Sequence, residues 1–122
     1  MVTIKVKQIK PNFTRDFNGT SYKTEARLEW VKNNPDAYFD VAEITYLYCT
    51  EAKAKNYAYE DTNSIHEYWV DALEYRFDED GRYKVFDFDP EIGGHRSTSV
   101  GDILEVNGVD YMVDSYGFSE VK

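Results

Sequence analysis

Apolar and polar residues alternate at the start of the chain. Over residues 2–9, the apolar side chains fall at every second position from Val2 to Val6, with Thr and Lys residues between them. A period of two predicts a half-buried β-strand. A second strand is predicted over residues 39–48, which are rich in apolar, aromatic and β-branched side chains.

Two stretches in the first half of the chain predict helices. Residues 23–33 predict a short amphipathic helix that buries Trp30, Ala26 and Leu28 and ends before Pro35. Thr50 is a suitable N-cap for a second helix that runs to Asp61. Between the first strand and the first helix we expect a loop, which is marked by Pro11, Asn18 and Gly19 and carries Phe13 and Phe17.

The second half of the chain predicts strands and turns. Residues 68–77 and 82–88 flank an acidic segment that ends in Asp80 and Gly81, which favours a hairpin. A second hairpin is predicted where residues 103–106 and 109–113 flank Asn107 and Gly108, followed by a last short strand over 118–121. We therefore predict a single α+β domain over residues 1–122, with a mainly antiparallel sheet and one or two short helices.

Composition and charge narrow the classes of function. The 122 residues carry 14 basic and 23 acidic side chains, a formal net charge of −9, which disfavours a general nucleic-acid coat but permits a pocket for one small anion. No apolar run approaches the roughly 20 residues of a membrane-spanning helix. The single Cys49 excludes an intrachain disulfide, and the N-terminal residues lack a secretory pattern, so we expect a cytoplasmic protein.

Catalytic and metal motifs are not evident in the sequence. His66 and His95 lie far apart and outside any zinc-binding pattern, and no loop has the ligand spacing of a calcium site. No serine lies in a nucleophile elbow, and Cys49 sits in an apolar run. We therefore predict no metal, no cofactor and no catalytic residues.

Residues 61–69 form the first candidate binding segment. Asn63 offers a donor and an acceptor that suit a base edge or a ribose hydroxyl. Trp69 offers a face on which a base can stack. The alternative is that Asn63 simply ends a helix and that Trp69 belongs to the core.

Residues 93–102 form the second candidate segment. Two glycines allow close approach of the backbone to a ligand, and Arg96 is followed by the hydroxyl residues Ser97, Thr98 and Ser99. The fixed fork of an arginine matches a pyrophosphate. The alternative is a surface loop in which Arg96 pairs with one of the many carboxylates.

These motifs resemble those of a family of small phage proteins, the Thoeris anti-defence sponges. The resemblance rests on Tyr59 (one residue out of register), residues 62–69, residues 96–102, residues 108–113, and Gly117 with Phe118, and it covers roughly residues 38–121. Sponges of that family bind cyclic ADP-ribose isomers made by bacterial TIR-domain immune enzymes and hold them without cleavage. They assemble as dimers or higher oligomers, and some also bind cyclic trinucleotides at a separate site.

The resemblance implies a role for several residues of this chain. Trp69 falls where the family places a base-stacking aromatic and Arg96 where it places a phosphate contact, with Asn63 and residues 97–99 as motif neighbours. Phe13 is a second candidate for stacking on adenine. The expected function is sequestration of a cyclic ADP-ribose-type signal in the cytoplasm of an infected bacterium, without enzymatic activity.

Two other functions stay open at this point. An acidic inhibitor would occupy the nucleic-acid groove of a host nuclease, and an adaptor domain would bind no small ligand. We further expect a homodimer or larger homo-oligomer that covers Tyr57, Tyr59 and Tyr68. A second anion site is expected at Lys23 and Arg27, although the same residues could pair with Glu25 or Glu29 on a solvated helix face.

Overall fold

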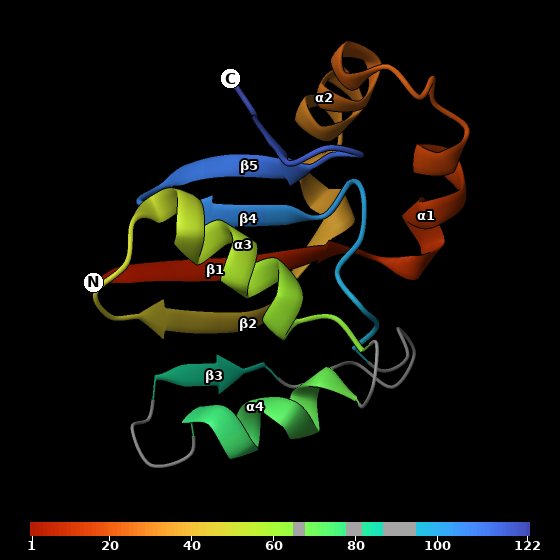
Figure 1. Cartoon of the computed structure of the whole chain (residues 1–122). Helices are drawn as coiled ribbons and strands as arrows, with labels where there is room; N and C mark the ends of the chain where they lie inside the picture. Colours follow the sequence, from red (N-terminus) through yellow and green to blue (C-terminus); the bar gives the residue numbers. More distant parts are fainter. Residues whose placement is uncertain (65–67, 78–81, 87–94) are drawn as a thin grey trace.

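An antiparallel sheet is the framework of the protein in the computed structural model, which describes residues 1–64, 68–77, 82–86 and 95–122. Within this part of the chain the strand order is β3-β2-β1-β4-β5-β6 (Figure 1). The strands are β1 (Val2–Ile9), β2 (Tyr38–Tyr46), β3 (Tyr83–Val85), β4 (Ile103–Val106), β5 (Val109–Val113) and β6 (Phe118–Glu120). Every neighbouring pair is antiparallel, so the predicted α+β class is confirmed.

One face of the sheet is covered by helices α3 (Glu51–Asp61) and α4 (Trp69–Phe77), as Figure 1 shows. Alternate residues of β1 point toward these helices, which is the arrangement that the sequence period predicts. The larger core lies between the two layers and includes Ile4, Val6, Val41, Ile44, Ala54, Ala58, Trp69, Leu73, Leu104 and Val106. Each large side chain buried here contributes about 1.5–3 kcal/mol of favourable transfer free energy.

The second face is covered only in part. Helices α1 (Pro11–Asn18) and α2 (Thr24–Asn33) and the short 3₁₀ helix η1 (Pro35–Ala37) gather at one end of the sheet (Figure 1). They enclose a smaller core of Ile9, Phe17, Trp30, Val31, Ala37, Ile103 and Met112. The rest of this face therefore meets solvent, and its residues are polar.

A row of charged side chains crosses this uncovered part of the second face. Lys84, Glu43, Lys5, Glu105 and Asp110 lie opposite one another on five neighbouring strands. Directly opposed residues of an antiparallel sheet share a face, so the first four alternate in sign and attract one another. A sheet face of this kind needs no covering layer.

Helix α4 replaces a predicted strand. Residues 68–77 were expected to pair with residues 82–88, but Trp69, Ala72 and Leu73 are all buried, at the i, i+3, i+4 spacing of one helix face. The predicted hairpin is therefore wrong, and its turn at residues 78–81 lies outside the described residues. The strand expected over residues 82–88 is present as the shorter edge strand β3, Tyr83–Val85.

Helix α1 replaces the loop expected around Phe13 and Phe17. Pro11 occupies the first turn, where its missing N–H costs nothing, and Phe17 packs edge-on against Trp30 with ring centroids 5.1 Å apart. The described residues thus contain four α-helices where one or two were predicted. None of the helices in the described ranges is long and apolar enough to cross a membrane.

Local sequence signals were correct at three other places. Thr50 caps α3 by accepting a hydrogen bond from the N–H of Lys53, at 3.2 Å. Asn107 and Gly108 join β4 to β5 with φ values of 52° and 80°, the positive pair that the tightest hairpin turn requires. Helix α2 also lies where the amphipathic pattern predicts it.

Gly101 is expected to tolerate alanine far less well than Gly108. A Cβ at Gly101, whose φ is +96°, would lie 2.5 Å from the Phe17 ring and 2.9 Å from the Ile9 side chain, whereas a Cβ at Gly108 would meet nothing within 4 Å. Both substitutions strain a left-handed backbone, but only Gly101→Ala also overpacks a core, which adds about 1–3 kcal/mol. Urea unfolding of both variants measures the difference, and equal losses would contradict the packing at Gly101.

Candidate functional site

Arg96 and Asp102 form a two-point ion pair in the loop that precedes β4. Nη1 of Arg96 lies 2.6 Å from Oδ2 of Asp102, and Nη2 lies 2.7 Å from Oδ1. The backbone N–H groups of Ile9 and Ser99 donate to the same carboxylate, at 2.9 Å and 2.8 Å. The Asp102 side chain is fully buried and that of Arg96 is 38% exposed. The pair therefore fastens the loop to the end of β1.

This geometry corresponds to the alternative in which Arg96 pairs with a carboxylate. Nη1 also donates to the carbonyl of Ser97 and to the hydroxyl of Ser99. A phosphate that displaced Asp102 from the guanidinium would leave this carboxylate buried without its cation, which costs several kcal/mol. The contact of Arg96 with a phosphate stays a prediction, and the partner that the structure shows for its guanidinium is Asp102.

Trp69 is a core residue. Its side chain is 0% exposed, and its indole N–H donates to the carbonyl of Arg96 at 2.8 Å. The ring lies 5.7 Å from the buried His95 ring and packs in the larger core under α3 and β1. Because both faces of the indole are covered, Trp69 offers no surface for a base, and the stacking prediction is corrected.

The hydroxyl residues of the same loop bind protein groups. Thr98 and Thr62 are buried with their hydroxyl oxygens 2.7 Å apart, and Thr98 also accepts from Gln8 at 3.3 Å. The Ser97 hydroxyl accepts from the backbone N–H of Ser64 at 2.8 Å. The loop and the end of α3 are thus held together by hydrogen bonds to each other.

The remaining predicted site residues do not gather at one site. Asn63 is half-buried where α3 ends, and Ser99 is exposed. Phe13 packs against the smaller core, whereas Trp69 belongs to the larger one, so the structure does not bring these two rings to one site. Lys23 is exposed at the start of α2, but Arg27 pairs with Asp114 at 3.0 Å and is not a free anion-binding cation.

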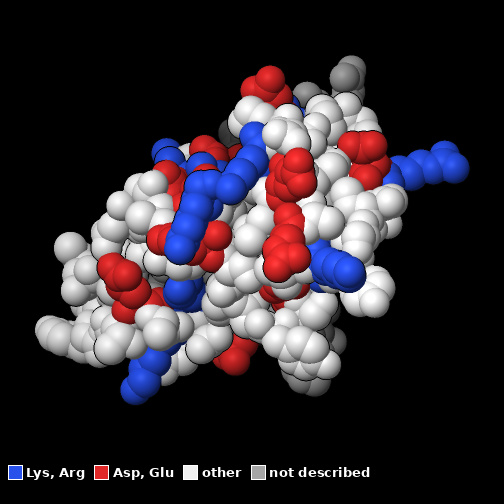
Figure 2. All heavy atoms as spheres, turned by 90° about the horizontal axis from the view of Figure 1, so that it is seen from above, with Lys and Arg blue, Asp and Glu red and all other residues white. Residues whose placement is uncertain are grey.

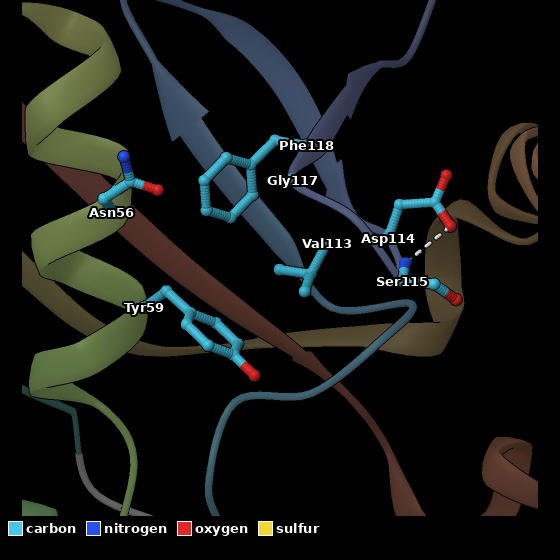
Figure 3. A pocket seen from close by; sticks show the side chains of 7 residues that line it. All are labelled: Asn56, Tyr59, Val113, Asp114, Ser115, Gly117 and Phe118. Carbon is cyan, nitrogen blue, oxygen red and sulfur yellow. Dashed lines mark hydrogen bonds between the residues drawn. The ribbon is translucent and has the colours of Figure 1, made fainter.

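A pocket that the residue analysis did not single out opens between α3 and the β5–β6 turn (Figure 3). We call it the aromatic pocket; it has a volume of about 190 Å³ and is lined by Asn56, Tyr59, Val113, Asp114, Ser115, Gly117 and Phe118. The Tyr59 and Phe118 rings stand edge to face, with centroids 6.3 Å apart and planes at 69°. In Figure 3, the Asn56 amide extends from α3 beside the Phe118 ring.

A cation lies close to the aromatic pocket. The Lys55 ammonium is 3.6 Å from the centroid of the Tyr111 ring and 5.9 Å from that of Phe118. Lys55 precedes Asn56 on α3, so one helix supplies both an amide and an ammonium to this region. The pocket thus combines aromatic walls, an amide that donates and accepts hydrogen bonds and the Asp114 carboxylate, with the Lys55 ammonium close to the Phe118 ring.

Part of this pocket was present in the sequence motifs. Tyr59, Gly117 and Phe118 were among the residues that carried the family resemblance, although no binding role was given to them. Asn56 had no signal, because nothing in its neighbourhood shows that α3 faces the β5–β6 turn. The packing of α3 across the sheet brings it there.

Asp114 holds the turn between β5 and β6 against helix α2. Its carboxylate accepts from the Thr24 hydroxyl at 2.6 Å, from Arg27 at 3.0 Å, from the Ser115 N–H at 2.8 Å and from the Ser119 hydroxyl at 3.2 Å. Partial burial acts to raise the pKa of Asp114, but these hydrogen bonds outweigh it and hold the pKa below its ordinary value. Asp114 is therefore ionised at neutral pH and its role is to position the turn.

On the other side of this turn lies a second depression, which we call the tyrosine hollow. It has a volume of about 230 Å³ and is lined by Tyr22, Thr24, Asp114, Ser115 and Tyr116. Tyr22 is 81% exposed and Tyr116 is 98% exposed. The surface tyrosines named for an oligomer contact are less exposed: Tyr57 and Tyr68 are 44% and 42% exposed, and Tyr59 is half-buried against the core.

Figure 2 shows acidic and basic side chains interspersed on the face seen from above Figure 1, with no patch of a single sign there. The described residues contain no group of three or more His, Cys, Asp or Glu side chains arranged to hold a metal ion.

Comparisons of the chain with protein-family models, curated proteins and solved structures found no match.

Proposed function

We propose that this protein binds a cyclic ADP-ribose-type nucleotide in the aromatic pocket and holds it without cleaving it. The observation that carries the proposal is the convergence of Tyr59, Phe118 and Asn56 on one pocket beside the Lys55 ammonium. The ligand class comes from the motif resemblance, and four of the motif residues line this pocket: Tyr59, Val113, Gly117 and Phe118. We therefore assign base stacking to the Tyr59 and Phe118 rings in place of Trp69.

The size and walls of the pocket suit one base and not the whole nucleotide. A volume of about 190 Å³ admits a planar ring system, with the ribose and phosphates remaining outside. A base that lies against one ring meets the edge of the other, which is a favourable aromatic geometry. Stacking of this kind contributes about 1–3 kcal/mol per base.

Asn56 is suited to recognise the edge of that base. Its side-chain amide is exposed and carries both a donor and an acceptor, as required to pair with the adjacent N and N–H groups of adenine. The Ser115 hydroxyl on the opposite wall can bind a ribose oxygen. Because the Asn56 amide and the Ser115 hydroxyl are exposed, ligand binding replaces their hydrogen bonds to water with hydrogen bonds to the ligand. No buried hydrogen-bonded pair has to break.

Lys55 supplies the charge for the phosphates. Its ammonium lies over the Tyr111 ring, a cation–π contact between half-buried residues that is worth about 0.5–2 kcal/mol. A hydrogen bond to a charged phosphate oxygen contributes about 1.5–3 kcal/mol, so the ammonium gains by turning to a ligand that is bound alongside. Retention then depends on slow release and not on complementarity to a transition state.

Calorimetric titration with cyclic ADP-ribose isomers tests the proposal. Asn56→Ala is expected to weaken binding about tenfold, by loss of about 1.4 kcal/mol of hydrogen bonding, while alanine leaves the exposed face of α3 stable. Asn63→Ala separates the two candidate sites, since binding lost there instead would place the ligand at the loop of Arg96. Ligand recovered intact after heat denaturation of the complex supports sequestration; a cleaved product, or no binding of any isomer, refutes it.

A further inference from the structure

Tyr22 and Tyr116 present two aromatic rings to solvent at one place on the surface. They lie 94 positions apart in the sequence yet line the same hollow, and they are 81% and 98% exposed. Exposed aromatic rings that converge on a depression are typical of recognition sites. Nothing in the proposed nucleotide site uses either ring, because that site lies on the other side of the β5–β6 turn.

The two rings are presented by anchored segments. The Tyr116 turn is closed by a bond from the Asp114 N–H to the Gly117 carbonyl at 2.9 Å, and Asp114 is bound to Thr24 and Arg27 of α2. On the other side of the hollow, Thr20 lies two residues before Tyr22, and both its N–H and its hydroxyl donate to the Phe17 carbonyl. Because hydrogen bonds hold the backbone beside each ring, binding removes less backbone freedom.

The chemistry of the hollow favours a planar cation. The faces of tyrosine rings carry negative potential and attract guanidinium groups, which stack flat on them. The Arg27–Asp114 pair beneath the rings is neutral as a unit, and the formal net charge of the chain is −9, so the long-range field attracts a basic partner. Lys23 is exposed next to Tyr22. Of the residues named in this paragraph, it carries the one charge that opposes the binding of a cation.

We propose that the tyrosine hollow is a docking site for an arginine side chain of a basic protein partner, with the guanidinium stacked on Tyr22 and Tyr116. Thr24 and Ser115 line the same hollow and offer hydroxyl oxygens to its N–H groups. The partner is thus recognised by a planar charge and not by an extended apolar surface. The hollow shares Asp114 and Ser115 with the aromatic pocket, but its two tyrosine rings take no part in the proposed nucleotide site, and the test below does not depend on nucleotide binding.

Titration of the full chain with a glycine-flanked arginine pentapeptide, followed through the ring signals of Tyr22 and Tyr116 by NMR, tests this site. The arginine peptide is expected to shift both rings, while the same peptide with neutral citrulline in place of arginine is not. Tyr116→Phe keeps the ring face and should retain affinity within about twofold, whereas Tyr116→Leu should lose about two- to fivefold. The same pair of substitutions at Tyr22 is expected to behave alike.

The sign of the charge effect gives a second criterion. Lys23→Gln removes the opposing ammonium and should tighten binding of the arginine peptide, and added salt should weaken it. Equal binding of the citrulline peptide, or unchanged affinity in the Leu variants, overturns the proposal. Shifts of both rings with adenosine monophosphate but not with the arginine peptide would also overturn it, by making the hollow a base-stacking site.

Discussion

Replacement of Trp69 by alanine is expected to lower the free energy of unfolding by about 3–5 kcal/mol. The side chain is fully enclosed in the larger core, and its indole N–H donates to the Arg96 carbonyl, so truncation leaves a cavity and removes one of the two side-chain hydrogen bonds that this carbonyl accepts, the other coming from Gln8. Domains of this size have a total stability of about 5–15 kcal/mol, so the variant will be marginal. Circular dichroism melts should show a fall in Tm of about 10 °C or more.

Trp69→Phe is the matched control for the cavity. Phenylalanine fills most of the space but lacks the N–H, so its loss should be clearly smaller than that of alanine. If Trp69→Ala melts like the parent protein but no longer binds a cyclic ADP-ribose isomer, then Trp69 is a stacking residue and its assignment to the core is wrong. Reading Tm and ligand titration together separates these outcomes.

Arg96→Ala should destabilise the protein by about 3 kcal/mol, through the carboxylate that it leaves behind. Asp102 is buried, and its charge would lose the two hydrogen bonds from the guanidinium. Removal of one partner from a buried pair costs about 3–5 kcal/mol. We expect the lower end because Arg96 is 38% exposed, so water can take part of its place.

The Arg96→Ala defect should depend on pH in a defined direction. Burial raises the pKa of Asp102 above its ordinary value, and the bonds from Arg96 oppose that rise. Without Arg96 the folded-state pKa rises further, so the variant binds the Asp102 proton more tightly when folded than when unfolded. Its stability is then highest below the unfolded pKa of about 3.9 and falls as the pH rises toward the folded value.

The difference in stability between Arg96→Ala and the parent protein should therefore grow from pH 4 toward pH 7 in urea titrations. The double variant Arg96→Ala/Asp102→Asn carries no titrating group at this place and should lose that additional pH dependence. A defect that is constant across this range, or absent, would mean that the Arg96–Asp102 pair does not hold the loop. In that case the guanidinium would be available to a phosphate.

Features specified by neighbouring residues were predictable from the sequence alone. The hairpin at Asn107 and Gly108, the cap at Thr50 and the strand of residues 2–9 each depend on local backbone preference or on a period of two. The α+β class follows from the order of such segments. These predictions needed no knowledge of which surfaces meet, because the controlling interactions lie within a few positions of one another.

The predictions for residues 69–77 and 11–18 were wrong because a short aromatic-rich segment fits both the two-residue period of a strand and the 3.6-residue period of a helix. Tyrosine, tryptophan and valine favour strands, yet Trp69, Ala72 and Leu73 lie on one helix face that a core can cover. Tertiary burial outweighed local preference at α4. At α1, Pro11 was read as a loop marker although it also suits a helix start, and the contact of Phe17 with Trp30 gives that helix its packing.

The sequence motifs led us to expect Arg96, the hydroxyl residues and Trp69 at one ligand site, and the structure joins them to each other and to the end of α3 by hydrogen bonds. Only the tertiary structure decided what they bind. An arginine, with its several N–H donors, can bind a ligand or a buried carboxylate equally well. Which of the two it binds depends on whether an acceptor such as Asp102 is packed within reach. The aromatic pocket likewise exists only because α3 crosses the sheet beside the β5–β6 turn, a contact between segments that no local pattern encodes.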